Sequence, residues 1–192
     1  MILIVILTVC YLAGSVNFSI IVFRLTGRGD PRNAYSGNPG MTNVYRQCGF
    51  PMAALVLVLD MGRSILVAML AVAFLPAHLV PWAAFGLIVG NRYPVFHDFR
   101  GGKGVANYLG FSMYLAPAAA ALSAVVWLLV FAFLRKPFLG SFAMIAILTI
   151  ALIVRCSFQL PCIAGTILTA GFIAYSHKRN VKAWLAEVNH HP

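Results

Sequence analysis

Two polar segments of the chain combine glycines with side chains that can bind an anion. The first lies between Arg24 and Gly49, and its centre, residues 36–43, reads Ser-Gly-Asn-Pro-Gly-Met-Thr-Asn, followed shortly by Arg46. Its glycines and proline force tight turns that expose backbone N–H groups. Such N–H groups, with hydroxyl, amide and guanidinium donors beside them, form concave anion sites. We interpret the segment as an anion-binding loop, with a plain polar connection between helices as the alternative.

The second segment, residues 97–107, reads His-Asp-Phe-Arg-Gly-Gly-Lys-Gly-Val-Ala-Asn and leads into an apolar stretch. Glycines directly before a helix let an anion approach the N-terminal N–H groups, where the helix dipole favours negative charge. Lys103 adds a positive charge at the same place. The segment is not a nucleotide-binding P-loop, because His97 occupies the position of its first glycine and Gly104 replaces the Ser or Thr that binds magnesium.

Two further groups of polar residues could carry chemistry. His177 and Asn180 follow the last apolar stretch and are three residues apart, so a helix would place them on one face. A histidine there can take up or release a proton near neutral pH. Asp60 and Arg63 have the same spacing inside an apolar stretch, where ionisable groups usually pair. This second pair could serve function or structure alone.

The composition indicates an integral membrane protein. Of 192 residues, 61% are hydrophobic and 9% charged, whereas soluble domains carry about 25% charged residues. These values exclude a soluble enzyme, a disordered regulator and a disulfide-rich scaffold. The formal net charge of +10 is better explained by contacts with anionic lipid than with nucleic acid, which we do not expect as a partner. The four cysteines show no CxxC pair and no histidine at ligand spacing, so no metal site is predicted.

The apolar stretches predict where the chain crosses the membrane. A span needs about 20 apolar residues to cross ~30 Å of hydrocarbon. The stretch 105–134 is too long for one comfortable span and contains Pro117, which could kink one helix or separate two. The other candidate spans are residues 2–23, 50–75, 82–96, 139–154 and 161–175.

Charge favours two helices at Pro117. The basic loops 97–103 and 135–137 then share one side with the other basic segments, and little more than Arg155 is left on the opposite side. The positive-inside rule therefore predicts seven transmembrane helices, with the N-terminus outside and the C-terminus in the cytoplasm. The fourth helix would have about 12 residues and a length of ~18 Å. We expect an all-α bundle that forms one domain over residues 1–192, with 183–192 as a frayed cytoplasmic tail.

These segments resemble the motifs of a known enzyme family. Residues 36–44 and 99–106 resemble two signature motifs of the PlsY-type acyl-phosphate:glycerol-3-phosphate acyltransferases, His177-x-x-Asn180 resembles that family's C-terminal motif, and Gly14-Ser15 resembles its first. The resemblance implies seven transmembrane helices in the bacterial cytoplasmic (inner) membrane and an active site that faces the cytoplasm. It also implies transfer of a fatty acyl group from acyl phosphate to the 1-hydroxyl of glycerol 3-phosphate, which yields lysophosphatidic acid and phosphate for phospholipid synthesis. No metal, coenzyme A or other cofactor is implied, and we expect a monomer.

The resemblance also implies roles for individual residues. Whether His177 or a substrate phosphate accepts the hydroxyl proton stays open at this stage. The residues expected to be catalytic are Ser36 and His177. Those expected to bind glycerol 3-phosphate are Arg46, Lys103, Ser141 and Asn180. Those expected to bind the acyl phosphate are Ser36, Gly37, Asn38, Gly40, Thr42, Asn43, Gly101 and Gly102.

The chain departs from this family's pattern at several positions. Asn91 stands where the family usually has histidine, Arg63 where lysine is usual, Asn17 where proline is common and Asn107 where threonine is common. A diverged inactive paralogue and an anion-transporting membrane protein are the alternative readings. A transporter would place polar residues near the middle of the membrane and show inverted repeats, whereas these polar segments are expected on one face and no repeat is visible.

Overall fold

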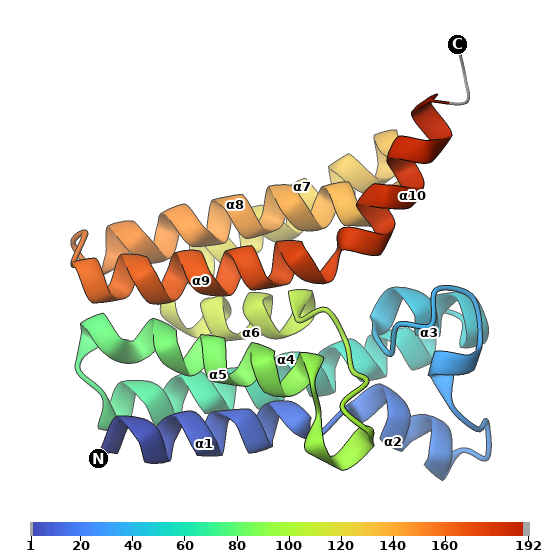
Figure 1. Cartoon of the computed structure of the whole chain (residues 1–192). Coiled ribbons are helices and arrows are strands. Elements are labelled where there is room, and N and C mark those ends of the chain that lie inside the picture. The colour runs from blue at the N-terminus through green and yellow to red at the C-terminus, as the bar shows by residue number, and fades with distance from the viewer. Residues whose placement is uncertain (1, 190–192) are drawn as a thin grey trace.

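The structure, a computed structural model, describes residues 2–189, and every regular element within that range is a helix. Most helices run side by side, with the N-terminus at one end of the bundle and the C-terminal helix leaving the other (Figure 1). The α-helices are α1 (Ile2–Ser15), α2 (Phe18–Leu25), α3 (Met41–Cys48), α4 (Phe50–Phe74), α5 (Val80–Arg92), α6 (Val105–Leu115), α7 (Pro117–Leu134), α8 (Pro137–Arg155), α9 (Leu160–Ser176) and α10 (Lys178–Asn189). Short 3₁₀ helices cover Pro31–Asn33, Ala77–Leu79 and Val95–His97.

By length and hydropathy, four helical segments could cross a membrane: α1 joined to α2, α4, α7 and α8. The pair α9 and α10, bent by 53°, would make a fifth if it were a single span. Helices α5, α6 and α9 are shorter but lie within the bundle, where α5 packs against α1 and α9, and α6 packs against α4. The protein is therefore an all-helical, multi-pass membrane protein.

Pro117 separates two helices, as the charge argument predicted. Helix α6 ends at Leu115 and has 11 residues, and α7 begins at Pro117. Proline suits the first position of a helix because its fixed φ is already helical and an N–H there has no partner within the helix. The short fourth hydrophobic helix expected from the sequence is thus present as α6.

The first apolar stretch, predicted as a span over residues 2–23, is found as a candidate span over Ile2–Leu25, but it contains a break. Helix α1 ends at Ser15 and α2 begins at Phe18. Asn17 causes the restart, because its side-chain oxygen accepts a hydrogen bond from the backbone N–H of Ile20 at 3.1 Å and caps α2. Hydropathy alone could not show this break, since apolar residues continue on both sides of it.

The end of the chain also differs from its prediction as a frayed tail over residues 183–192. Residues 183–189 continue α10, and residues 190–192 lie outside the described part of the chain. Helix α10 is held against the start of α8, where the rings of Trp184 and Phe138 lie 6.0 Å apart and Lys136 pairs with Glu187. These contacts with another helix are invisible in the local sequence.

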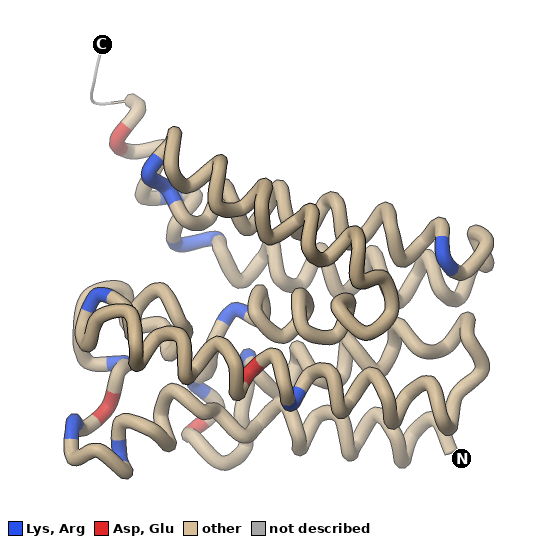
Figure 2. Tube along the Cα trace, turned by 180° about the vertical axis from the view of Figure 1, so that it is seen from behind, with Lys and Arg blue, Asp and Glu red and all other residues tan. Residues whose placement is uncertain are grey.

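The ends of the bundle differ in charge. Most Lys and Arg residues gather toward the end from which α10 leaves (Figure 2). Arg155 lies at the opposite end, where α8 turns into α9. At that turn Cys156 and Cys162 form a disulfide.

Helices α1 and α5 pack with their backbones in direct contact. A Cβ atom added to Gly14 would overlap the carbonyl oxygen of Leu87, and one added to Gly90 would overlap the carbonyl oxygen of Tyr11. Small residues allow such close approach of helices in membranes. This contact sets the position of the C-terminal end of α5, from which the segment with Lys103 departs.

Gly90→Ala should lower the unfolding temperature in detergent, because the added methyl group forces α1 and α5 apart at a cost of ~1–3 kcal/mol. Gly171→Ala on α9 is the matched control, since its Cβ would meet no atom within 4 Å. Thermal unfolding followed by tryptophan fluorescence measures both variants. Equal unfolding temperatures for the two would contradict a close α1–α5 contact.

Candidate functional site

An open cavity of about 320 Å³ brings together the two glycine-containing polar segments and the pair His177 and Asn180. Its polar wall comes from the loop before α3, the start of α6, the first turns of α8 and the junction of α9 with α10. Its apolar wall continues along α4, α6, α7 and α8, from residues Leu57, Leu109, Ala124, Trp127, Leu128 and Met144. The cavity is therefore amphipathic, with donors on one part of its wall and hydrocarbon on the other.

Most site residues predicted from the sequence line this cavity. They are Ser36, Asn38, Gly40, Thr42, Asn43, Arg46, Gly102, Lys103, Ser141, His177 and Asn180. Gly37 and Gly101 do not line it. Gly37 forms a turn with a φ of +64°, and Gly101 packs against the end of α5, where a Cβ would overlap the carbonyl oxygen of Asn91. These two glycines shape the loops behind the wall.

Asn43 organises the first polar loop. Its side chain is buried, with its Nδ2 donating to the carbonyl oxygen of Pro31 at 2.9 Å and to that of Ala34 at 3.3 Å. Its Oδ1 accepts a hydrogen bond from the backbone N–H of Ser36 at 3.3 Å. The amide therefore folds the loop around Ser36, and Asn43 also lines the cavity, where it was expected to bind the acyl phosphate.

Arg32 joins the first and second polar segments, a role that no motif in the sequence predicts. Its guanidinium donates to the carbonyl oxygens of His97 at 2.8 Å and Arg100 at 3.0 Å, and it pairs with Asp30 at 2.6 Å. The Arg32 guanidinium lowers the pKa of Asp30, and Asp30 in turn raises the pKa of Arg32. The pair is thus charged at neutral pH and ties the loops together.

Lys103 lies at the centre of the polar wall. Its Nζ donates to the side-chain oxygen of Asn180 at 2.8 Å, and no carboxylate within residues 2–189 forms an ion pair with it. Burial lowers the pKa of Lys103 to about 8, and the positive charges of Arg92 and Arg46 act in the same direction. An anion in the cavity would offset this repulsion and favour the charged ammonium.

His177 caps the end of α9 and is buried beside Lys103. Its Nδ1 lies 2.9 Å from the carbonyl oxygen of Ile173. Because a carbonyl only accepts, Nδ1 carries the hydrogen, and Nε2 keeps a free lone pair in the neutral ring. Burial lowers the pKa of His177 to about 4, so the ring is neutral at pH 7. It can therefore accept a proton or a hydrogen bond.

Trp127 connects the polar and apolar walls. Its Nε1 donates to the hydroxyl oxygen of Ser141 at 3.4 Å, while that hydroxyl donates to the carbonyl oxygen of Pro137 at 3.1 Å. Its indole also stacks on Phe131, with ring centroids 5.3 Å apart. Sequence reasoning missed Trp127, because a tryptophan in an apolar stretch is most simply explained by packing.

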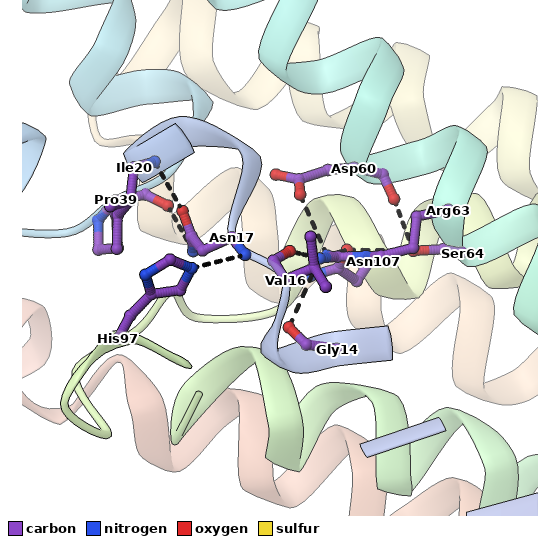
Figure 3. Close-up of polar contacts among 10 residues, drawn as sticks. All are labelled: Gly14, Val16, Asn17, Ile20, Pro39, Asp60, Arg63, Ser64, His97 and Asn107. Carbon is purple, nitrogen blue, oxygen red and sulfur yellow. Dashed lines mark hydrogen bonds and ion pairs between the residues drawn. The ribbon is translucent and has the colours of Figure 1, made fainter. Parts of the chain in front are cut away.

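Several departures from the family pattern noted in the sequence lie at or next to this cavity. Asn91 and Asn107 line it, as does Asp60. Arg63 donates a hydrogen bond to the side-chain oxygen of Asn107 at 2.5 Å (Figure 3). No group of three or more His, Cys, Asp or Glu side chains within residues 2–189 is placed to hold a metal ion. The chemistry available in the cavity is thus cationic, hydrogen-bonding and basic.

Comparison with known proteins gives consistent matches over nearly the whole chain. Residues 4–187 match the family model described as glycerol-3-phosphate acyltransferase. A glycerol-3-phosphate acyltransferase of Azotobacter vinelandii is 37% identical over 94% of this chain and 95% of its own length. One from Neisseria meningitidis serogroup B is 38% identical over 90% of this chain and 88% of its own length.

Solved structures agree with the sequence matches. The glycerol 3-phosphate form of PlsY (YgiH), an integral membrane glycerol 3-phosphate acyltransferase, superposes with a TM-score of 0.88 at 31% identity, covering 96% of this chain and 92% of that one. Its lysophosphatidic acid form gives a TM-score of 0.83 at 30% identity with the same coverage.

Lys103 should react with an amine-acylating reagent with an apparent pKa of about 8. Inorganic phosphate should raise that pKa, because a nearby anion favours the ammonium form. Peptide mass spectrometry of samples labelled between about pH 6 and pH 10 measures the reacted fraction, with the exposed Lys178 of the same sample as reference. An unchanged Lys103 titration in phosphate would contradict an anion site at this residue.

Proposed function

The chain belongs to the glycerol-3-phosphate acyltransferase family, and from that premise we propose that it transfers a fatty acyl group from an acyl phosphate to the 1-hydroxyl of glycerol 3-phosphate. The products are lysophosphatidic acid and phosphate. The observation that carries the proposal is the single cavity that joins the cationic wall around Lys103 and Arg46 to an apolar wall. The glycerol 3-phosphate and lysophosphatidic acid forms of the similar PlsY structure support it.

The two substrates divide the polar wall between them. Arg46, Lys103, Ser141 and Asn180 bind glycerol 3-phosphate, with the phosphate countering the mutual repulsion of the two cations. Ser36 and its loop, with Gly102, bind the acyl phosphate through hydroxyl and backbone N–H donors. The fatty acyl chain lies along the apolar wall of α4, α6, α7 and α8. Asn43 lines the cavity within the Ser36 loop, and Gly37 and Gly101 support the loops from behind.

His177 is the proton acceptor in this proposal. Its neutral ring presents Nε2 as the basic nitrogen, since Nδ1–H is held by Ile173. The glycerol hydroxyl gives its proton to Nε2 as its oxygen attacks the acyl carbonyl carbon, and the bond from that carbon to the phosphate oxygen breaks. Phosphate leaves with the electron pair and then takes the proton. Because phosphate is a good leaving group, positioning and charge stabilisation supply most of the rate, and no covalent enzyme intermediate is needed.

The proposal includes seven membrane spans. Helices α1 and α2 together make the first, and α4, α5, α6, α7, α8 and α9 make one each. Most Lys and Arg residues lie toward the end of the bundle from which α10 leaves. By the positive-inside rule, this supports placing that end and the cavity on the cytoplasmic side, with the N-terminus outside. The enzyme then acts as a monomer without a cofactor in the bacterial inner membrane.

Purified protein in detergent should release orthophosphate only when both glycerol 3-phosphate and palmitoyl phosphate are present. With palmitoyl-CoA in place of palmitoyl phosphate, it should release no free CoA thiol. Lys103→Ala should lower kcat/KM by at least ~10²-fold, because it removes the charge that offsets the substrate phosphate. Lys182→Ala, an exposed lysine on α10, is the matched control and should keep wild-type activity. Turnover with palmitoyl-CoA, or none from folded wild-type protein, would refute the proposed reaction.

Replacing His177 by glutamine separates proton transfer from simple orientation of the hydroxyl. Glutamine can accept a hydrogen bond but cannot take the proton, so His177→Gln and His177→Ala should both lower kcat by ~10²–10⁴-fold. The KM for glycerol 3-phosphate should change much less. Steady-state kinetics on variants with a wild-type unfolding temperature measure this, and near-normal kcat in His177→Gln would argue against proton transfer by the ring.

A further inference from the structure

Arg63 lies where three parts of the fold meet, well inside the apolar length of α4 (Figure 3). One of its terminal nitrogens donates to the carbonyl oxygens of Gly14 and Val16, at the break between α1 and α2. The other donates to Asp60 at 3.1 Å and to Asn107 at 2.5 Å. Its side chain is only 7% exposed. A single buried guanidinium therefore bonds to α4, α6 and the interrupted first span.

On the side of the first span, Arg63 satisfies carbonyl groups that the end of α1 leaves without helical partners. Positive charge is also favourable at a helix C-terminus. The guanidinium lies 5.4 Å from the ring centroid of Phe18, the first residue of α2. Asn17, between the two helices, reaches the carbonyl oxygen of Pro39 at 3.5 Å. The break is thus linked to the loop that carries Ser36.

On the other side, Asn107 belongs to the first turn of α6, four residues after Lys103. Its Oδ1 accepts from Arg63 and lies 3.0 Å from the hydroxyl oxygen of Ser64. Asn107 and Asp60 both form part of the cavity wall. A shift of Arg63 would therefore move the beginning of α6 and the lysine that precedes it.

We propose that Arg63 and Asn107 are positioning residues, which hold the first turn of α6, and with it Lys103, at a set distance from the break in the first span. The proposal rests on the proposed function, since Lys103 is the residue to be positioned for glycerol 3-phosphate. Arginine suits the task because its planar fork bonds in two directions at once, whereas a lysine offers donors from one nitrogen only.

Arg63→Lys is the informative substitution, because it keeps the positive charge beside Asp60 but cannot reach the α1 carbonyls and Asn107 together. We expect a folded protein with an unfolding temperature near that of the wild type. The KM for glycerol 3-phosphate should rise about tenfold, and kcat/KM should fall by up to ~10²-fold, as a misplacement of about 1 Å can cause. Arg155→Lys at the far end of α8 is the matched control and should behave as wild type.

Asn107→Leu removes the acceptor while keeping a similar volume, and it completes a double-mutant cycle with Arg63→Lys. If Arg63 acts through Asn107, the two losses in kcat/KM should not add, and the double variant should be no worse than the more severe single one. Additive losses, or an unchanged KM in a folded Arg63→Lys protein, would overturn the proposal. If Asn107→Leu does not fold, the KM of Arg63→Lys alone decides.

Hydrogen exchange provides a measurement that does not depend on turnover. Backbone amides of residues 101–108 should exchange faster in Arg63→Lys than in the wild type. In Arg155→Lys their exchange rates should equal those of the wild type. Faster exchange in a protein without acyltransferase activity would refute the proposed function but support the positioning role. Unaltered exchange would overturn the positioning role even if the enzyme is active.

Discussion

A peptide group inside hydrocarbon must find its hydrogen-bond partner within the protein, since an unpaired one costs several kcal/mol. This constraint governs the places where the helices of this bundle break. At Val16 and Asn17 the first span is interrupted, and the exposed groups are taken up by the side chain of Asn17 and by Arg63 from another helix. At Ala116 the break leaves fewer backbone groups unpaired, because Pro117 has no N–H that needs an acceptor. The short elements near the cavity exist because such partners are available.

The cavity differs from these breaks, because its cationic side chains Lys103 and Arg46 face a space that an anionic ligand can enter. Lys103 is half-buried, and desolvation and then the charges of Arg92 and Arg46 lower its pKa. Within residues 2–189 its Nζ forms a hydrogen bond with the neutral Asn180 amide and no ion pair. This environment disfavours the charged form of the Lys103 ammonium, and an anion bound beside it would favour that form. The aligned His177 ring, neutral and held by Ile173, adds a base without adding another cation. The proposed binding role of Lys103 and the proposed basic role of His177 therefore rest on the same arrangement of charges.

Sequence reasoning identified the features that are encoded locally. The grouping of Ser36, Lys103, His177 and Asn180 followed from short motifs, and the helix boundary at Pro117 followed from the distribution of charge. Features that depend on distant partners could not be predicted in the same way. Arg63 bonds the carbonyl groups at the break before Asn17, Arg32 links the two polar loops, and Trp127 bonds Ser141 of the next helix. Each of these is a contact between segments that hydropathy and spacing treat as independent.

The amphipathic lining of the cavity has a thermodynamic consequence for a lipid-making reaction. Exposing a fatty chain to water costs ~0.8 kcal/mol per methylene group. A chain that passes from the bilayer onto the walls of α4, α6, α7 and α8 exchanges one hydrocarbon surface for another, so this penalty never arises. Only the phosphate-bearing head group then has to be recognised by directional bonds. Such a cavity joins a polar wall, where directional bonds act, to an apolar wall that continues the hydrocarbon of the bilayer.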